Sequence, residues 1–406
     1  MKRRVTSLAV LATLCASALA AAPATSPASP PPKVIRVTRL DSAGPGTLRE
    51  ALSAKEPRLI VFEVGGVIDL ARDGLVIDEP HVTIAGQTAP PPGVTLIRGG
   101  ITIRTHDVRI THLRVRPGDA GQPKKSGWSP DGISTYGPDA HHVVIDHCSL
   151  TWAEDENLSA SGPRHDGRPG TSHDVTFSNC IIAEGLNDSS NEKGPHSKGS
   201  LIHDHCCNIS IVANLYANNA DRNPYFKADT TGVVVNNVIY NPGYAAVLLN
   251  YVEKEYRGTN EQPHNAMVAV VGNVYIPGRD TRRGLAMLGG RGDAFVEDNL
   301  VLGHAFPAVD ESINTLEARR WWPADLKPLP ARDVLAHVLA HAGAWPKDRD
   351  EIDRRIVQSV RDRTGRIIDS QDQVGGYPHV EPTHRPLTVP PDHFDEWLAT
   401  FAARAE

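Results

Sequence analysis

The chain has 406 residues, of which 22% are charged, 40% hydrophobic and 5% aromatic, with 34 Gly and 32 Pro. This composition is too apolar for a disordered chain, too low in glycine for collagen and without the heptads of a coiled coil. There are 42 Lys and Arg against 48 Asp and Glu, a formal net charge of −6. No nucleic acid is expected as a partner, because nonspecific binding to it needs a basic surface. Any polyanion bound by this chain must meet a local basic patch or a bound cation.

The first 22 residues have the composition of an export signal. Met1–Arg4 is basic, residues 5–20 are apolar, and Ala18-Leu19-Ala20 supplies the small residues of a cleavage site. The apolar run is too short and too rich in small residues to cross a bilayer, so no membrane span is expected. We expect residues 1–22 to be cleaved and the chain to be secreted, extracellular or periplasmic. Removal of three basic residues lowers the formal net charge from −6 to −9.

Residues 23–33 are rich in Ala, Pro and Ser and predict a flexible lead-in. Beyond them, a short segment with alternating apolar residues is repeated between about residue 80 and residue 302. Each copy has the period of a β-strand and is bounded by Gly, Asn, Asp or Pro. The copies occupy residues 81–84, 107–113, 142–148, 174–180, 208–211, 232–237, 266–270 and 294–296. Their irregular spacing fits coils of constant cross-section that carry loops of different length.

A polar residue follows these strands in a nearly aligned column, in which two positions need a shift of one residue. Its members are His112, His147, Asn179, Asn214, Asn237, Asn273 and Asn299. In a parallel β-helix such a column forms a ladder, with side-chain amides of successive coils bonded at about 4.8 Å. A β-sandwich or propeller would repeat strands without this column. We therefore predict an all-β fold, a right-handed single-stranded parallel β-helix over residues 34–315.

After about residue 315 the period changes to that of helices. Residues 350–360 place Ile352, Ile356 and Val360 four apart, and residues 392–401 form a second apolar face. A shorter helix is expected at residues 333–342. Residues 316–406 are thus expected to form a helical and irregular C-terminal extension packed on the β-helix, where it would cover an end or a side of the coils.

Four cysteines follow the export signal: Cys148, Cys180, Cys206 and Cys207. An exported protein permits disulfides, but four cysteines in so long a chain do not make a disulfide scaffold. Disulfides and buried free thiols both remain open.

Polar clusters on the expected loops carry the candidate chemistry. They include Asp131, the pair Asp155 and Glu156, Lys198, and the segment 221–227 with Arg222 and Lys227. Residues on successive coils lie one strand apart, so these clusters are expected to form one groove with carboxylates at one level and cations at the next. Trp128 and Trp152 are candidates for stacking on a sugar, although Trp152 equally suits the core.

Several blocks occur in an order that is more specific than any one motif. They are Gly46-Thr47-Leu48-Arg49-Glu50-Ala51, residues 59–68, residues 82–87, Val144-Ile145-Asp146-His147-Cys148-Ser149 and Arg222-x-Pro224. With these blocks the chain resembles the pectate lyases of polysaccharide lyase family 1 over roughly residues 35–245. The resemblance implies eliminative, Ca²⁺-dependent cleavage of 1,4-linked galacturonan. The expected partner is an acidic plant polysaccharide, polygalacturonate or pectate, and the enzyme is expected to be a monomer.

The resemblance also implies residue roles. Asp131 and Asp155 resemble calcium ligands, Lys198 the lysine that binds the substrate carboxylate, and Arg222 the catalytic base. The chain departs from the family pattern at two positions. Ser159 stands where many members have a second calcium aspartate, with Glu156 as a possible substitute. Lys227 stands where many members have a second arginine, and we expect it to take part in both catalysis and substrate binding. Trp128 is expected to bind the substrate.

The chemistry has a physical rationale of its own. Removing the C5 proton of a uronate is difficult because the neighbouring carboxylate is already negative. Ca²⁺ and other cations at that carboxylate stabilise the charge that develops, and Ca²⁺ accepts a flexible set of oxygen ligands. A free guanidinium scarcely loses its proton. The base role of Arg222 therefore follows from the resemblance, whereas its electrostatic role follows from its charge.

Two other functions remain open. A polygalacturonase-like hydrolase would need paired carboxylates around the scissile bond, and the chain shows neither the Asp-Asp pair nor the Gly-His-Gly motif of such enzymes. A non-catalytic β-helix that binds polysaccharide is the other alternative, and a different uronan is a possible substrate. His147 beside Asp146 suggests an acid–base pair, but its place in the polar column favours a structural hydrogen-bonding role.

Overall fold

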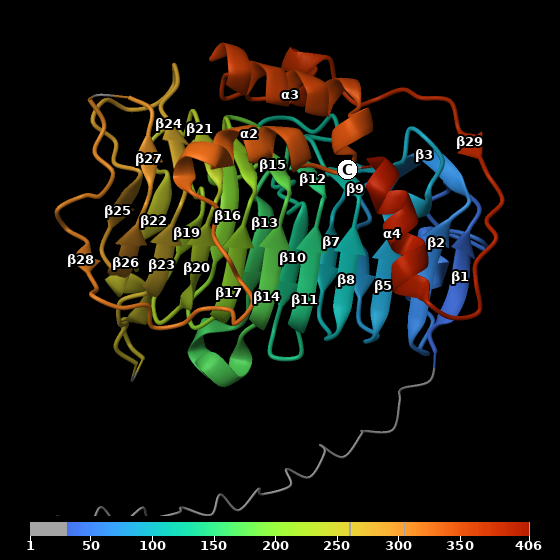
Figure 1. Ribbon diagram of the computed structural model, residues 1–406, viewed down its shortest axis with the longest axis horizontal. Helices are drawn as coiled ribbons and strands as arrows, with labels where there is room; N and C mark the ends of the chain where they lie inside the picture. The colour runs from blue at the N-terminus through green and yellow to red at the C-terminus, as the bar shows by residue number, and fades with distance from the viewer. Residues whose placement is uncertain (1–30, 260, 304, 406) are drawn as a thin grey trace, which may run out of the picture. The chain divides into compact units, whose positions relative to one another are not determined.

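The computed structural model describes residues 31–405 apart from residues 260 and 304, with side chains described as far as residue 402. The export signal predicted at residues 1–22 and nearly all of the lead-in at 23–33 lie outside the described residues. Residues 32–406 form one compact unit. Within it the chain visits three sheets in turn, so that most coils place one strand in each of them (Figure 1).

The three sheets have the following strands among the described residues. The first sheet has eleven, in the order β1 (Lys33–Val37), β2 (Arg58–Phe62), β5 (Val82–Ala85), β8 (Val108–Thr111), β11 (His141–Asp146), β14 (His173–Ser178), β17 (Cys207–Val212), β20 (Thr231–Val235), β23 (Met267–Val271), β26 (Asp293–Glu297) and β28 (Asn314–Thr315). The second has eight, β4 (Leu75–Ile77), β7 (Ile101–Ile103), β10 (Ile133–Tyr136), β13 (Glu156–Ser161), β16 (Lys198–Ile202), β19 (Tyr225–Phe226), β22 (Val247–Leu249) and β25 (Leu288–Gly290). The third has ten, β29 (Thr383–His384), β3 (Val64–Asp69), β6 (Val94–Ile97), β9 (Leu113–Arg116), β12 (Ser149–Thr151), β15 (Ile181–Ala183), β18 (Leu215–Ala217), β21 (Val238–Tyr240), β24 (Val274–Ile276) and β27 (Leu300–Val301).

Neighbouring strands of each sheet pair in parallel, except that β29 pairs with β3 in the antiparallel sense. The register is regular: in β8, for example, Val108 and Ile110 point into the core while Arg109 between them is exposed. Inward-facing Val, Ile and Leu from all three sheets build one apolar core. The predicted all-β, right-handed parallel β-helix is confirmed.

The amide ladder lies at the turn between the first and third sheets. Asn214, Asn237 and Asn273 each donate a side-chain hydrogen bond of 3.0 Å to the amide oxygen of the next asparagine, and the last of these acceptors is Asn299. The side-chain oxygens of the row also accept backbone N–H groups: Asn214 accepts that of Cys180 at 2.8 Å, and Asn237 accepts that of Asn214 at 2.9 Å. Every amide in the row is therefore used twice, which satisfies buried polar backbone at each coil.

The remaining members of the predicted column do not belong to this ladder. His112, His147 and Asn179 lie one position earlier, because the register of β11 and β14 sets Asp146 opposite Ser178. These three residues have positive φ angles of 47° to 57°, a backbone conformation in which His and Asn are enriched. The rings of His112 and His147 stack with centroids 5.2 Å apart. The predicted column thus combined two adjacent rows of residues. One row has the left-handed backbone conformation of the turn, and the other is the asparagine ladder.

The four cysteines are free thiols in this structure. Cys148, Cys180 and Cys206 are buried and Cys207 is half-buried. Burial raises the pKa of Cys180 and Cys206 above the ordinary value for a thiol, so these groups act as small apolar side chains.

A short helix, α1 (Leu48–Leu52), lies against the N-terminal coil. Thr47 caps it by accepting the Glu50 N–H, while the Glu50 carboxylate accepts the Gly46 N–H at 2.6 Å. This arrangement resembles a capping box, except that the residue before the N-cap is the donor. Leu48, Ala51 and Leu52 are buried in the β-helix core. The helix therefore covers apolar residues that the first coil would otherwise expose.

The C-terminal extension contains three α-helices, α2 (Ala331–His341), α3 (Glu351–Asp362) and α4 (Phe394–Ala405). Val334 of α2 and Ile356 of α3 pack against outward-facing residues of the third sheet such as Ile181, and α4 packs across β2 and the turn after β5 through Leu398 (Figure 1). Six single turns of 3₁₀-helix complete the described elements: η1 (Gly86–Thr88), η2 (Arg164–Asp166), η3 (Arg168–Gly170), η4 (Glu253–Tyr256), η5 (Pro346–Asp348) and η6 (Gln371–Val374). None of the helices in the described part of the chain is long and apolar enough to cross a membrane.

Buried charges anchor α3 to the coils. The Arg116 guanidinium donates to Asp350, the N-cap of α3, at 2.6 Å and to Asp353 at 2.8 Å. Arg116 and Asp353 are fully buried, and Ser149 donates a further hydrogen bond of 2.6 Å to Asp353. Such buried pairs are costly to break because one charge would remain unpaired, so they specify where α3 docks.

Candidate active site

The predicted site residues lie at the beginnings of four neighbouring strands in the second sheet. Asp131 precedes β10, Glu156 begins β13, Lys198 begins β16 and Arg222 precedes β19. Glu156 and Lys198 are direct partners in the β13–β16 register, and Lys198 forms an isolated bridge with Asp221. Residues that are far apart in the sequence are thus about 4.8 Å apart across the strands. The structure brings together five of the predicted residues: Asp131, Asp155, Glu156, Lys198 and Arg222.

Asp131 is held by the neighbouring strand β13. Its carboxylate accepts the backbone N–H of Glu156 at 3.2 Å and the hydroxyl of Ser159 at 3.0 Å. Burial, together with the negative charge of Asp155, raises the pKa of Asp131 above its ordinary value. Ser159, the departure noted in the sequence, therefore orients Asp131 by a hydrogen bond and adds no charge of its own.

Asp155, Glu156 and His196 form a second part of the site. His196 Nε2 lies 2.8 Å from Asp155 Oδ1, and one ligand atom from each of the three residues lies within 4.8 Å of the others. Burial alone would raise the pKa of Asp155, but the hydrogen bond and charge of His196 lower it. The sequence analysis did not identify His196 as a site residue.

A buried glutamate positions the loop that carries His196. Glu154 accepts hydrogen bonds from the Ser189 hydroxyl at 2.6 Å and from the backbone N–H groups of Ser190 and Asn191 at 3.1 and 3.2 Å. Burial raises its pKa. Glu154 therefore has a positioning role, which its place beside Asp155 in the sequence did not reveal.

Arg222 lies against the carboxylates. Its guanidinium pairs with Glu156, and its backbone has a φ of 61°, which is uncommon for a residue other than glycine and often marks a functional position. The backbone is held by the Ser200 N–H, which donates to the Arg222 carbonyl, and by Asp221, which accepts the Arg222 N–H at 2.8 Å. Burial lowers the pKa of Arg222, although nearby negative charge opposes this.

Lys198 lies one strand from Glu156. Its ammonium is 2.8 Å from Asp221 and donates to the Tyr244 hydroxyl at 3.1 Å, with the ammonium 5.6 Å from the ring centroid. Burial alone would lower the pKa of Lys198, but the charge of Asp221 raises it. The ring of Tyr244 is 47% exposed, so it offers an aromatic surface beside a buried cation. The sequence analysis did not identify Tyr244, which follows no predicted strand motif.

A buried amide network supports these side chains from behind. Asn157 donates to the backbone carbonyl of Lys198 at 3.1 Å and to Asn219 at 3.2 Å, and Asn219 donates to Asn223 at 3.0 Å. All three asparagines are at most 1% exposed. The network links the starts of β13, β16 and β19 and thereby restricts the positions of Glu156, Lys198 and Arg222 relative to one another.

The structure places Lys227 elsewhere. It follows β19 and lies level with His203, five residues beyond Lys198, or roughly 16 Å along the strands. Its ammonium is 3.0 Å from Asp204 and 2.6 Å from Glu255. The expectation that Lys227 joins Lys198 and Arg222 in one cluster is therefore corrected: an extended strand separates them.

The two tryptophans that were candidates for stacking on a sugar have structural contacts instead. Trp128 is half-buried, its indole donates to the Gly118 carbonyl at 2.9 Å, and its own carbonyl accepts the Ser190 hydroxyl. Trp128 therefore helps to hold the loop that carries His196. Trp152 is fully buried and donates a hydrogen bond to Glu184. It therefore belongs to the core and does not stack on a sugar.

The donor set suits a hard cation. Asp131, Asp155 and Glu156 offer carboxylate oxygens from neighbouring strands, which Ca²⁺ prefers. Three carboxylates gather there, and burial, with the charge of Asp155 added, raises the pKa of Asp131. A divalent cation would compensate the negative charge of these groups. His196 is the exception in this set, because its nitrogen suits softer metals.

The chain has relatives of known name. It is 32% identical over 359 residues to a protein of Aspergillus flavus named probable pectate lyase C, covering 85% of this chain and 77% of the relative. The Aspergillus oryzae protein of the same name is 32% identical over 355 residues, covering 84% and 76%. No family model matches the chain.

Solved structures show the same fold. The major allergen from cedar pollen superposes with a TM-score of 0.55 at 14% identity, covering 76% of this chain and 88% of the allergen. A pectate lyase bound to a hexasaccharide has a TM-score of 0.51 at 13% identity, covering 77% and 92%. At these identities the likeness concerns the β-helix alone.

Proposed function

The chain belongs to the pectate lyase family, as its sequence motifs predicted, and is a polysaccharide lyase; from this premise we propose that it cleaves 1,4-linked galacturonan by β-elimination and requires Ca²⁺. One observation carries the proposal. Arg222, in a left-handed backbone conformation, is held beside the carboxylates of the site and one strand from Lys198. A base next to a cation that can bind a carboxylate is what eliminative cleavage of a uronate needs.

Each residue has a proposed task. The Lys198 ammonium binds the carboxylate of the sugar whose C5 proton is removed. Arg222, whose burial favours the neutral form, takes that proton. The electron pair of the C5–H bond forms the C4–C5 double bond as the bond from C4 to the leaving oxygen breaks. The leaving oxygen keeps that bonding pair and takes a proton from water, which gives the hydroxyl of the released sugar. Asp131, Asp155 and Glu156 would hold Ca²⁺, which supplies positive charge against the developing negative charge of the substrate carboxylate.

Two residues are reassigned. We propose that Lys227 supports the fold, because its charge is already balanced by Asp204 and Glu255. Trp128 holds the loop of His196 and influences substrate binding through that loop. The exposed ring of Tyr244, beside Lys198, is the aromatic surface on which a sugar would rest.

The sequence also supports a proposal for the location and partner of the enzyme. The signal-like residues 1–22 support secretion, extracellular or periplasmic, and the mature chain would act as a monomer. Polygalacturonate or pectate is the expected substrate. Because the mature chain would have a formal net charge of −9, calcium and the Lys198–Arg222 pair provide the local positive charge that brings in an acidic polymer.

The test is to incubate the protein with polygalacturonate and Ca²⁺ and to follow the ultraviolet absorbance of the unsaturated product together with new reducing ends. An increase in both that a chelator abolishes and added Ca²⁺ restores is the expected result. New reducing ends without absorbance would identify a hydrolase. If neither the absorbance nor the number of reducing ends changes and the protein still binds the polymer, the protein is a non-catalytic polysaccharide-binding protein. Elimination that persists after chelation would refute the calcium requirement alone.

A further inference from the structure

A group of histidines lies on the first sheet, away from the strands that carry the candidate active site. His81 immediately precedes β5, and His106 and Asp107 immediately precede β8. The β5–β8 register sets Val82 opposite Val108, which places His81 level with Asp107. Two adjacent coils thus bring two imidazoles and one carboxylate to the same point of the surface.

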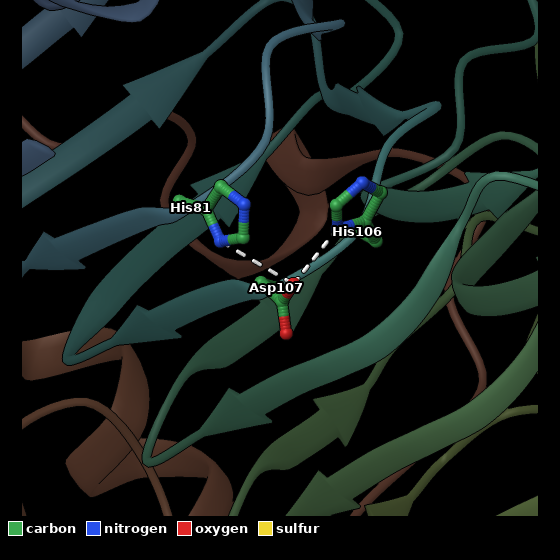
Figure 2. Close-up of side chains that lie close together, drawn as sticks. All are labelled: His81, His106 and Asp107. Atoms are coloured by element: carbon green, nitrogen blue, oxygen red, sulfur yellow. Dashed lines mark hydrogen bonds and ion pairs between the residues drawn. The ribbon is translucent and has the colours of Figure 1, made fainter. Parts of the chain in front are cut away.

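The side chains converge on one atom. His106 Nδ1 lies 2.8 Å and His81 Nδ1 lies 3.3 Å from the same oxygen of Asp107, Oδ2. Figure 2 shows the two rings on either side of the carboxylate. Their planes are nearly perpendicular, at 86°, with centroids 5.2 Å apart. The two nitrogen–oxygen distances, 2.8 and 3.3 Å, are near the separation of about 3.4 Å that ligands 2.1 Å from a tetrahedral metal would have. One ligand atom from each residue lies within 4.8 Å of the others.

We propose that His81, His106 and Asp107 bind a divalent transition metal, with Zn²⁺ as the preferred ion among those available in solution. Two imidazole nitrogens and one carboxylate oxygen form a ligand set typical of zinc, with the remaining position left to water. The side chains of His81, His106 and Asp107 are 52%, 33% and 45% exposed, so an ion reaches them directly from solvent. Ca²⁺ takes oxygen ligands and does not compete for this site.

Backbone conformation and ring stacking fix the positions of the proposed ligand residues. His81 and Asp107 have φ angles of 56° and 54°, so both occupy the left-handed turn that precedes a strand. His106 is further fixed by stacking on His141, with ring centroids 4.8 Å apart and planes at 5°. Ligands that are held before the ion arrives lose little conformational entropy on binding. The ion would join two successive coils and would therefore stabilise the folded chain.

The same turn occurs again two coils later and provides an internal control. His173 and Asp174 repeat the His–Asp pair, with His173 Nδ1 2.7 Å from Asp174, and Asp174 has a φ of 51°. On the preceding coil, His142 is level with Asp174 as His81 is with Asp107, but its Nδ1 lies 2.6 Å from Nδ1 of His141. Asn208 of the next coil donates a hydrogen bond of 2.9 Å to Asp174. At this second location the His142 ring faces another histidine and the Asp174 carboxylate already accepts an amide hydrogen bond, so we expect it not to bind the ion.

The experiment uses the full chain without an affinity tag, in buffer with saturating Ca²⁺, titrated with ZnCl₂ by calorimetry. The matched variants are His81→Asn, Asp107→Asn and the control Asp174→Asn, since asparagine tolerates the left-handed backbone at each position. We expect one zinc per chain, at least a tenfold weaker affinity in the first two variants, and unchanged affinity in the control. Zinc should also raise the melting temperature of the wild type by about 2–4 °C, but not that of His81→Asn.

Four results would overturn the proposal. They are no zinc binding in the presence of Ca²⁺, equal affinity in all variants, equal loss in the control, and loss on His196→Gln but not on His81→Asn. The last would place the ion at the candidate active site. Circular dichroism of each variant separates a lost ligand from a lost fold. Because the lyase site lies on another sheet, His81→Asn should retain polygalacturonate cleavage, so failure of this proposal and failure of the proposed function give different results.

Discussion

Lys198 and Lys227 are two buried lysines that are similar in exposure and in having an aspartate partner, but we propose different roles for them. Each side chain is 7% exposed, and each ammonium lies within 3.0 Å of an aspartate. Lys198 has one carboxylate partner and an exposed tyrosine beside it. Lys227 lies between two acids, and Arg164 pairs with both of them, at 3.1 Å and 2.9 Å.

The difference lies in how completely the charges are matched. Around Lys227, two cations meet two anions, and Tyr256 donates a further hydrogen bond of 2.6 Å to Asp204. No charge in this cluster is left for a ligand. Around Lys198 and Arg222 the carboxylates of Asp131, Asp155, Glu156 and Asp221 exceed the cations, and exposed surface adjoins them. An unmatched charge beside exposed surface is therefore a better sign of a substrate site than burial or charge alone.

The largest effect is expected for Arg222→Ala. If Arg222 removes the C5 proton, kcat should fall by about 10³-fold, within the range typical of a lost general base. Initial rates on polygalacturonate with saturating Ca²⁺ measure this. A variant that keeps a tenth of the wild-type rate would contradict the role.

Lys198→Met and Lys227→Met test the comparison directly. Loss of Lys198 should lower kcat/KM by about 10²-fold, because a cation at the substrate carboxylate is lost. Loss of Lys227 should leave kcat/KM within about threefold when it is measured well below the melting temperature of the variant. Equal losses of activity in the two variants would show that the two lysines belong to one site after all.

Stability should show the opposite order. Removing Lys227 leaves Asp204 and Glu255 with one cation, and breaking a buried pair typically costs about 3–5 kcal/mol of unfolding free energy. Urea unfolding of Lys227→Met measures this cost. A variant as stable as the wild type would remove the structural role proposed for Lys227.

The pH dependence of that cost has a defined sign. Burial alone would raise the pKa of Asp204, but the charge of Lys227 and the hydrogen bond from Tyr256 lower it from 3.8 to about 2. A lowered carboxyl pKa contributes stability above the unfolded value, and this contribution is lost as pH falls from about 4 towards 2. The stability difference between wild type and Lys227→Met should therefore shrink over that range. A difference that stays constant from pH 6 to pH 3 would exclude the Asp204–Lys227 pair as its source.

A smaller effect is expected for Tyr244→Phe. The variant keeps the exposed ring but loses the hydroxyl that accepts a hydrogen bond from Lys198, so KM should rise by only about twofold to fivefold, with kcat nearly unchanged. Tyr244→Ala, which also removes the ring, should raise KM further. Unchanged KM in both variants would remove Tyr244 from the substrate site.

Much of the fold was predictable because each coil repeats the same constraints. Period-2 strands, turn residues and the asparagines at 214, 237, 273 and 299 predicted the β-helix, and apolar residues four apart predicted α3. The predicted polar column nevertheless combined two rows, since His and Asn favour both a left-handed turn and a ladder position. Only the strand register separates the rows, and register is a property of pairing between coils.

The candidate site was less predictable for two physical reasons. Arg222 and Lys227 are five residues apart in the sequence, but β19 lies between them and places Lys227 level with His203, beyond the end of β16. His196 and Tyr244 lie on segments outside the strand repeat. The loop of His196 is held by the buried Glu154, and Tyr244 contacts the buried Lys198. Sequence spacing therefore locates residues on strands well and residues on inserted loops poorly.

The most direct test of the central claim is the mass of the fragments that the wild-type protein releases from polygalacturonate in the presence of Ca²⁺. Elimination at the Lys198–Arg222 site predicts fragments with an unsaturated, non-reducing end, each lighter by one water molecule than the corresponding saturated oligomer, and none from Arg222→Ala under the same conditions. Saturated fragments from the wild type, or unsaturated fragments at an undiminished rate from Arg222→Ala, would contradict it.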